Sequence, residues 1–276
     1  MRHSFKAWGQ QTDWPALRDI WIEADRDGFW DMVWLNDHLI PPKSEEHLPI
    51  FEAWALLAGA AATTERLRFG TMVSSNTFRH PGVLAKTIAT IDHMSEGRLE
   101  IGLGAGWHER EHESYGIPLP ALSERFDRLE ETLAIVNGLL TQDTYSFAGR
   151  FHTLVEARCE PKPVQEPRPP FVVGGAGMKR TMAIAARWAD QWNYPDYTGE
   201  LEPLATRIPH LRELMTAAGR DPASIEISAQ FRYGGDPVEA RDRAEAYREI
   251  GVDHVLVSFT PPIDPTLPGI VAEALA

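Results

Sequence analysis

The segment from residue 66 to residue 107 constrains the fold most, because it reads as strand, polar bend, helix, strand and glycine turn. An apolar run from Leu67 to Val73 stops at Ser74-Ser75-Asn76, and Pro81 begins a helix whose apolar positions share one face. The next strand, Leu99 to Leu103, runs into Gly104-Ala105-Gly106. This pattern predicts one unit of a parallel β/α fold, in which chemistry collects where strands end and loops begin.

The same alternation continues along the whole chain. The other predicted strands are Phe5 to Trp8, Met32 to Leu35, Phe171 to Val173, Gln191 to Tyr194, Ile225 to Phe231 and His254 to Phe259. The segment from Thr144 to Pro170 interrupts the rhythm with a small predicted hairpin and a proline-rich stretch before the fifth strand. Eight strands that alternate with helices favour a (β/α)8 barrel over an open doubly wound sheet, and we expect a single domain over residues 1–276.

Composition narrows the class of protein. A net charge of −13 disfavours general binding to nucleic acid, whose phosphates need a basic surface. No apolar run approaches the roughly 20 residues that cross a bilayer, and the first residues lack the apolar core of a signal peptide. The single cysteine, Cys159, allows no internal disulfide. We therefore expect a cytoplasmic protein with no membrane or nucleic-acid partner.

The predicted helix over residues 51–62, FEAWALLAGAAA, is apolar on nearly every side. A helix that is apolar all round is buried on several sides rather than along one stripe. A subunit interface would supply one of those sides, so we expect a homodimer.

A glycine-rich turn is a candidate anion site. Gly174-Gly175-Ala176-Gly177 stands between a strand and a helix, where backbone N–H groups and the helix N-terminus favour an anion. Lys179 and Arg180 follow in the first helical turn, where cations are unfavourable unless an anion neutralises them. The same residues also suit a tight turn with surface charges. The other turn, from Gly102 to Gly106, lacks the spacing of a dinucleotide fingerprint, which argues against a Rossmann fold.

Two histidine motifs need an interpretation. The residues from His108 to His112 match H-E-x-x-H, but a glycine loop precedes them and Gly116 ends any helix soon afterwards. We therefore predict no metal site. His38 follows the second strand, where a histidine is either a hydrogen-bonded structural residue or a group that handles protons.

Several of these motifs, in this order, resemble the bacterial luciferase-like monooxygenase superfamily. The matching segments are Asn36-Asp37-His38, Ser74-Ser75-Asn76 with Arg79-His80-Pro81, GRLEIGLGAGWHEREHESYGIP over residues 97–118 and ARCEPKPVQEPRPPFVVGGAGMKRTMAIAARWADQWN over residues 157–193. Within the superfamily the chain is similar to the branch that uses coenzyme F420, a 5-deazaflavin, whereas sibling branches use FMN.

The resemblance implies a set of site residues. His38 would lie against the deazaflavin ring as the catalytic residue, and residues 108–112 would form a polar linker. The implied cofactor-binding residues are Asp37, Ser74, Ser75, Asn76, Ala105, Gly106, Trp107, Gly174, Gly175, Ala176 and Gly177. The resemblance also implies a non-proline cis peptide at Ser74-Ser75 and a pairing of barrels into a homodimer.

The expected activity is hydride transfer between F420 and a small organic substrate. A deazaflavin has carbon where flavin has its reactive nitrogen, so it carries hydride and reacts poorly with oxygen. Two alternatives stay open: an FMN-dependent monooxygenase, and a barrel that has lost its cofactor and serves as a binding protein. The intact glycine loops and His38 argue against the binding protein. Aromatic residues near strand ends predict an apolar or aromatic-lined pocket; they are Trp8, Trp34, Phe78, Trp192, Tyr194 and Phe231.

Overall fold

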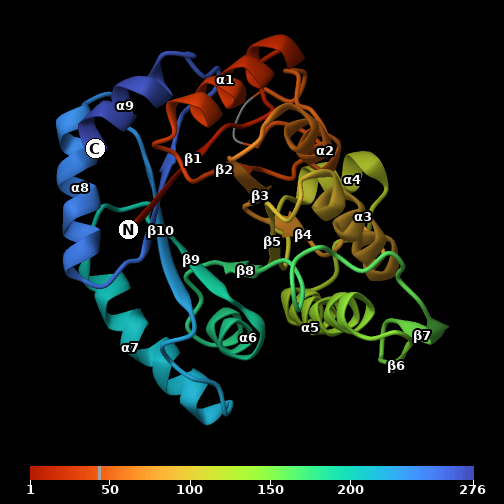
Figure 1. Ribbon diagram of the computed structural model, residues 1–276. Helices are drawn as coiled ribbons and strands as arrows, with labels where there is room; N and C mark the ends of the chain where they lie inside the picture. The colour runs from red at the N-terminus through yellow and green to blue at the C-terminus, as the bar shows by residue number, and fades with distance from the viewer. Residues whose placement is uncertain (43–44) are drawn as a thin grey trace.

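The computed structural model, which describes residues 1–42 and 45–276, is a closed barrel of parallel strands surrounded by helices (Figure 1). The eight barrel strands are β1 (Arg2–Lys6), β2 (Met32–Leu35), β3 (Arg68–Thr71), β5 (Leu99–Gly104), β8 (Phe171–Gly174), β9 (Gln191–Pro195), β10 (Glu226–Arg232) and β11 (His254–Ser258). Neighbouring strands pair in the order β3-β2-β1-β11-β10-β9-β8-β5, and the pairing of β3 with β5 closes the ring. The predicted (β/α)8 barrel is confirmed.

A helix separates each barrel strand from the next, and one more follows the last strand. These helices are α1 (Trp14–Asp27), α2 (Ala53–Thr63), α3 (Pro81–Met94), α5 (Leu122–Thr141), α6 (Arg180–Trp188), α7 (Glu202–Ala217), α8 (Pro237–Glu249) and α9 (Leu267–Leu275). Three of them begin with the same local chemistry: the side chains of Asp13, His80 and Asp236 accept a hydrogen bond from the first turn, and a proline follows directly or one residue later. A capping acceptor and an early proline both favour the start of a helix.

Three connections carry additional elements. After β3 the chain forms a two-residue strand, β4 (Ser74–Ser75), and after β5 it forms the short helix α4 (Glu109–Tyr115). Between α5 and β8, β6 (Tyr145–Ala148) and β7 (Thr153–Ala157) pair as an antiparallel hairpin. This is the hairpin that the sequence predicted before the fifth barrel strand, and it projects from the edge of the molecule beyond α5 (Figure 1).

The first strand begins earlier than the sequence predicted, at Arg2 rather than Phe5. Side chains alternate along a strand. Phe5 therefore packs outward, with its ring centroid 5.1 Å from that of Trp30, whereas Arg2 and Lys6 lie on the inner side of the barrel. The run of apolar residues begins at Phe5, and the charged Arg2 gave no indication that the strand starts earlier.

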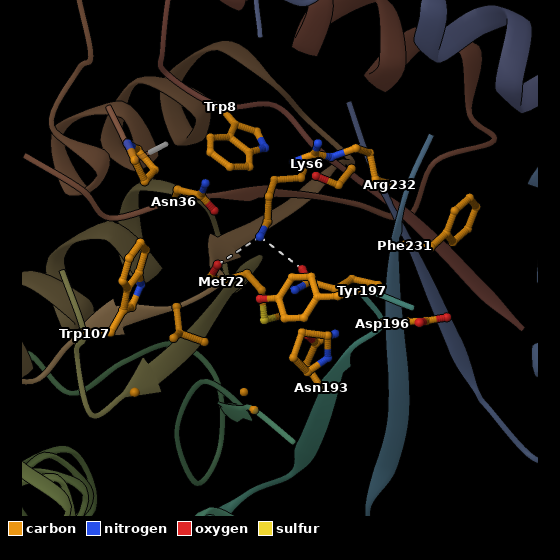
Figure 2. A pocket seen from close by; sticks show the side chains of 18 of the residues that line it. Lys6, Trp8, Asn36, Met72, Trp107, Asn193, Asp196, Tyr197, Phe231 and Arg232 are labelled. Carbon is orange, nitrogen blue, oxygen red and sulfur yellow. Dashed lines mark hydrogen bonds between the residues drawn. The ribbon is translucent and has the colours of Figure 1, made fainter. Parts of the chain in front are cut away.

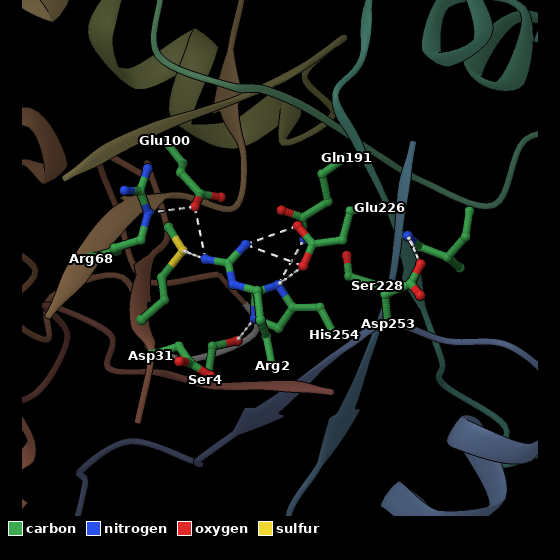
Figure 3. Close-up of polar contacts among 12 residues, drawn as sticks. Arg2, Ser4, Asp31, Arg68, Glu100, Gln191, Glu226, Ser228, Asp253 and His254 are labelled. Atoms are coloured by element: carbon green, nitrogen blue, oxygen red, sulfur yellow. Dashed lines mark hydrogen bonds and ion pairs between the residues drawn. The ribbon is translucent and has the colours of Figure 1, made fainter. Parts of the chain in front are cut away.

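Arg2 lies in a polar network that fills the amino-terminal end of the barrel (Figure 3). Its guanidinium contacts Glu100 on β5 at 2.8 Å and Glu226 on β10 at 2.9 Å. Arg68 on β3 also donates to Glu100, at 2.8 Å, and the Glu100 side chain is 3% exposed. Because these strands are not all neighbours, the network ties opposite walls of the barrel together.

The apolar helix α2 is buried within the single chain. Six of its residues contribute to the core: Ala53, Trp54, Leu56, Leu57, Ala60 and Ala61. Its Gly59 meets the ring of Trp14 from α1, and a Cβ at that glycine would lie 2.7 Å from the ring. Burial against the barrel and the adjoining helices accounts for the apolar composition of α2. The homodimer stays a prediction.

Among the described residues, no helix combines the length and the apolarity that crossing a bilayer requires.

Candidate active site

A cavity of about 860 Å³ opens at the carboxyl ends of the barrel strands (Figure 2). Of the residues that the sequence assigned to the site, eight line this cavity: Asp37, His38, Ser75, Ala105, Gly106, Trp107, Gly174 and Gly175. Four others are not among its lining residues, namely Ser74, Asn76, Ala176 and Gly177. The barrel thus brings segments that are far apart in the sequence to one mouth, as parallel strands require.

His38 is held by a carboxylate that the sequence did not single out. Its Nδ1 lies 3.0 Å from Oε1 of Glu111, and the backbone N–H of Leu39 donates to the same carboxylate at 2.9 Å. Glu111 comes from α4, and its side chain is 2% exposed. No spacing rule connects residues 38 and 111, so the pair emerges from the fold alone.

Electrostatics favours the ionised form of Glu111. Burial would raise the pKa of this carboxyl, but the hydrogen bond and electrostatic interaction with His38, together with the hydrogen bond from the Leu39 backbone, lower it below its ordinary value. An ionised carboxylate only accepts hydrogen bonds, so Nδ1 of His38 carries a proton. In the neutral imidazole, Nε2 is then the basic nitrogen, and among the described residues no hydrogen bond engages it.

Asp37 does not orient His38. Its carboxylate instead accepts hydrogen bonds from Nη1 and Nη2 of Arg79, at 2.5 and 3.0 Å, and Arg79 also pairs with Glu52. Asp37 thus faces Arg79, whereas His38 faces Glu111 of α4. The partner of His38 is therefore Glu111 and not the adjacent Asp37.

Of the polar residues after β3, Ser75 lies in the cavity wall, whereas Ser74 and Asn76 form hydrogen bonds outside it. Ser75 lines the cavity, and its hydroxyl lies 2.6 Å from that of Thr77. Ser74 is turned away and accepts a hydrogen bond from Trp54 at 2.9 Å, while the Asn76 side chain donates to the Gly104 carbonyl at 2.9 Å. The expected cis peptide at Ser74-Ser75 is wrong in position, because the non-proline cis bond lies at Met72-Val73.

The glycine turn after β5 packs directly on this wall. Gly106 has a φ of +79°, and a Cβ at this position would lie 2.2 Å from the Ser75 hydroxyl oxygen. A side chain is therefore excluded both by conformation and by contact. Trp107 follows, with its side chain 55% exposed at the rim of the cavity and its ring centroid 5.5 Å from that of His38.

The turn after β8 contributes Gly174 and Gly175 to the cavity wall. The carbonyl of Gly175 accepts a hydrogen bond from the Trp192 indole at 3.0 Å, which fixes the turn against β9. Arg180 needs no bound anion to neutralise its charge, because it forms an ion pair with Asp127 of α5 at 2.6 Å. The charge of Arg180 is therefore not evidence for an anion site at this turn.

The H-E-x-x-H residues are used as hydrogen-bonding groups. Nδ1 of His108 accepts from the Glu111 backbone N–H at 3.2 Å and caps α4. His112 contacts the Thr77 hydroxyl at 2.7 Å through Nε2 and the His108 carbonyl at 2.8 Å through Nδ1. Among the described residues, no cluster of three or more His, Cys, Asp or Glu side chains is placed to hold a metal ion. The expected polar linker is in part a seven-residue helix.

The predicted aromatic pocket is correct for two residues. Trp8 and Phe231 line the cavity, whereas Trp34 and Trp192 are completely buried and Phe78 packs on His112, with ring centroids 5.1 Å apart. Tyr194 is buried as well and is not among the lining residues. The sequence reasoning also missed several lining residues: Lys6, Asn193, Tyr197, Gln230 and Tyr233. Lys6 could have been predicted, because it lies four residues after Arg2 on β1 and so points to the same, inner side of the barrel.

A closed parallel barrel with its ligand cavity at the carboxyl mouth defines the general class, a TIM-barrel enzyme. Residues 2–261 match the family model described as luciferase-like monooxygenase. The chain belongs to this family.

Individual relatives are similar over most of the chain. An F420-dependent glucose-6-phosphate dehydrogenase of Microbacterium testaceum is 32% identical, over 86% of this chain and 69% of its own length. An F420-dependent secondary alcohol dehydrogenase, solved with an F420–acetone adduct, has a TM-score of 0.87 at 22% identity and covers 100% of this chain and 99% of its own. A coenzyme F420-dependent tetrahydromethanopterin reductase from Methanopyrus kandleri has a TM-score of 0.82 at 17% identity, with coverage of 99% and 98%. At these identities the two structures bear on the fold alone.

Proposed function

We propose that the chain is an F420-dependent oxidoreductase that transfers a hydride between the deazaflavin and a small organic substrate. The observation that carries the proposal is that the His38–Glu111 pair and the glycine turns after β5 and β8 line one cavity. The Microbacterium relative supports the choice of cofactor, because it is named for F420. A cytoplasmic location and a homodimer are part of the same proposal.

The cavity fits a large, flat cofactor. Its volume of about 860 Å³ lies in the range of roughly 300–1,000 Å³ found for ligand sites. Backbone forms the wall at Gly174 and Gly175, and at Gly175 the φ of +131° suits glycine. The rim carries exposed apolar side chains, Trp107 at 55% and Leu122 at 54%, which a bound ring system would cover.

The chain's own residues can then orient the reactants and move a proton. When bound, the deazaflavin supplies a carbon that accepts or donates hydride. Glu111 holds His38 through Nδ1, so that Nε2 exchanges a proton with a group in the cavity. Met72 and Val73 close one wall with apolar surface and exclude water from the reacting groups.

Separate titrations with F420 and FMN test the cofactor. We expect tighter binding of F420, read from quenching of protein or cofactor fluorescence, and no oxygen-dependent turnover. Tight FMN binding with oxygen-dependent turnover and no detectable F420 binding would contradict the proposal in favour of a monooxygenase. Binding of neither cofactor would favour a non-catalytic binding protein.

A further inference from the structure

Lys6 is a buried residue with an amine, and it has no part in the proton transfer proposed for His38. It ends β1, and the residue is 5% exposed. Its Nζ donates to the Met72 carbonyl and to Oε1 of Gln230, both at 3.1 Å, and Figure 2 shows the side chain reaching toward the middle of the lining residues. Both acceptors are uncharged, so among the described residues this amine, which lies in a wall of the cavity, has no neutralising hydrogen-bond partner.

Three of the carboxylates that line the cavity form ion pairs with residues other than Lys6. The carboxylates of Asp37, Glu111 and Asp196 are paired with Arg79, His38 and Arg243. The remaining charged lining residues are Arg232, Asp236 and Glu239. Within the described part of the chain, Lys6 has no carboxylate within ion-pair distance. Burial alone therefore acts on it, and lowers the pKa of the amine to about 7.

The hydrogen-bond geometry determines what the amine can offer a ligand. A neutral amine has two N–H bonds, and the Met72 carbonyl and Gln230 use both of them. Its lone pair is then the free position. In the charged form the same position becomes a third N–H. Lys6 can therefore accept a proton at this position and return it without losing either hydrogen bond.

We propose that Lys6 is a further catalytic residue, which contacts the oxygen of a substrate hydroxyl or carbonyl group and exchanges a proton with it. The inference rests on the proposed function, and it makes the substrate one half of an alcohol–carbonyl pair. In the oxidative direction the C–H bond breaks and its hydride leaves to the deazaflavin. The O–H proton passes to the neutral amine, and the C–O single bond becomes C=O. In the reductive direction the ammonium returns the proton to the oxygen.

Three variants separate this role from a merely structural one. Lys6→Met keeps the length of the side chain but removes the amine. Gln230→Glu keeps the contact and places a carboxylate beside the amine, which raises its pKa. Lys86→Met is the matched control, because Lys86 is exposed on α3 and is not among the lining residues.

The kinetic arm uses F420 reduction by secondary alcohols, from 2-propanol to 1-phenylethanol, at saturating F420. In the native chain the rate should rise with pH through about 7, because the neutral amine is the base. Lys6→Met should lower the rate about 10²-fold or more and remove this limb, with partial rescue by added ethylamine. Gln230→Glu should move the limb up by about one pH unit or more. A limb that is unchanged in both variants would overturn the proposal.

The second arm needs no substrate. Competitive acetylation by acetic anhydride, followed by mass spectrometry across a pH series, reports the titration of the Lys6 amine in the native chain. We expect a midpoint near 7, moved upward in Gln230→Glu and unchanged in Lys86→Met. A midpoint in the ordinary range of lysine, near 10.5, would overturn the proposal. F420 affinity is measured in the same samples. If F420 binds but Lys6 fails these tests, the proposed function stands; if F420 does not bind, the proposed function fails separately.

Discussion

At the scale of single residues, His38 is the group on which the proposed chemistry depends most directly. If Nε2 handles a proton beside the cofactor, His38→Ala should lower turnover at saturating cofactor about 10²- to 10⁴-fold and leave cofactor affinity nearly unchanged. His38→Asn should also lower turnover, because an amide cannot take up a proton and return it. A purely structural histidine predicts the opposite pattern, with weaker cofactor binding, lower thermal stability and normal turnover of the bound fraction.

Glu111 should act on the reaction through His38. Glu111→Gln removes the charge that favours a protonated Nδ1 and offers an amide that can present either its oxygen or its N–H group to the ring. We expect turnover to fall by about tenfold or more, with the pH–rate profile displaced and F420 affinity retained. Glu113→Gln on the same helix is the control, since the Glu113 side chain is 76% exposed. Equal effects from the two variants would show that the contact with His38 is irrelevant.

Site residues can be predicted from the sequence when they lie in short motifs that follow a strand, and not when they depend on a contact between distant segments. The structure places His38 and Gly106 in the cavity wall, and both follow strands in recognisable motifs. Glu111 could not be predicted as the partner of His38, because the pair joins the loop after β2 to α4 and no periodicity relates them. Lys6 was missed for another reason: reading β1 from the first apolar residue hid the alternation that directs Arg2 and Lys6 inward.

At the scale of elements, the turn between β8 and α6 should control cofactor affinity. Gly175→Asp places a carboxylate at the cavity wall, in a backbone conformation with a φ of +131° that few side chains adopt. We expect a large loss of F420 affinity while the barrel stays folded, as checked by circular dichroism and a fluorescence titration. The control Gly219→Asp introduces the same carboxylate at a residue that does not line the cavity, at a φ of +73° that Asp tolerates better. A folded Gly175→Asp variant with unchanged affinity would refute the anion-binding role of this turn.

Element positions were predictable wherever periodicity and caps agree. Met32–Leu35 is a strand with the predicted bounds, and α1 begins directly after its capping residue Asp13. The helix α4 is different, because its seven residues have no apolar stripe and depend on the His108 cap and the Gly116 stop. Such a short helix follows from tertiary contacts, chiefly those of Glu111 and His112, rather than from propensity.

At the scale of the whole molecule, the oligomeric state is open to direct measurement. The sequence predicted a homodimer from the apolar helix α2, most of whose apolar side chains are buried inside one chain. Light scattering should give about twice 30.9 kDa if the prediction holds. A mass of one chain over a wide concentration range would count decisively against it, and would leave intramolecular burial as the full explanation of this helix.

The network at the amino-terminal end of the barrel should contribute to the stability of the whole fold (Figure 3). Arg2→Met removes the cation that bridges Glu100 and Glu226, and leaves Glu100 with Arg68 as its one ion-pair partner in the described part of the chain. Losing one member of a fully buried pair costs about 3–5 kcal/mol. Since the Arg2 side chain is 31% exposed, solvent screening reduces the expected loss to about 1–3 kcal/mol.

The pH dependence distinguishes this ion-pair effect from a loss of packing. Burial would raise the pKa of Glu226, but contacts with His254 and Arg2 lower it below the ordinary 4.5. A carboxyl with a lowered pKa stabilises the fold above its unfolded pKa, and this contribution is lost as the pH falls through the folded value. In urea unfolding, the difference between the native chain and Arg2→Met should therefore shrink as the pH falls below 4.5. The control Arg18→Met, at an exposed pair with Asp19, should change stability by less than about 0.5 kcal/mol. A difference that is constant with pH would mean that Arg2 stabilises the barrel by packing rather than by charge.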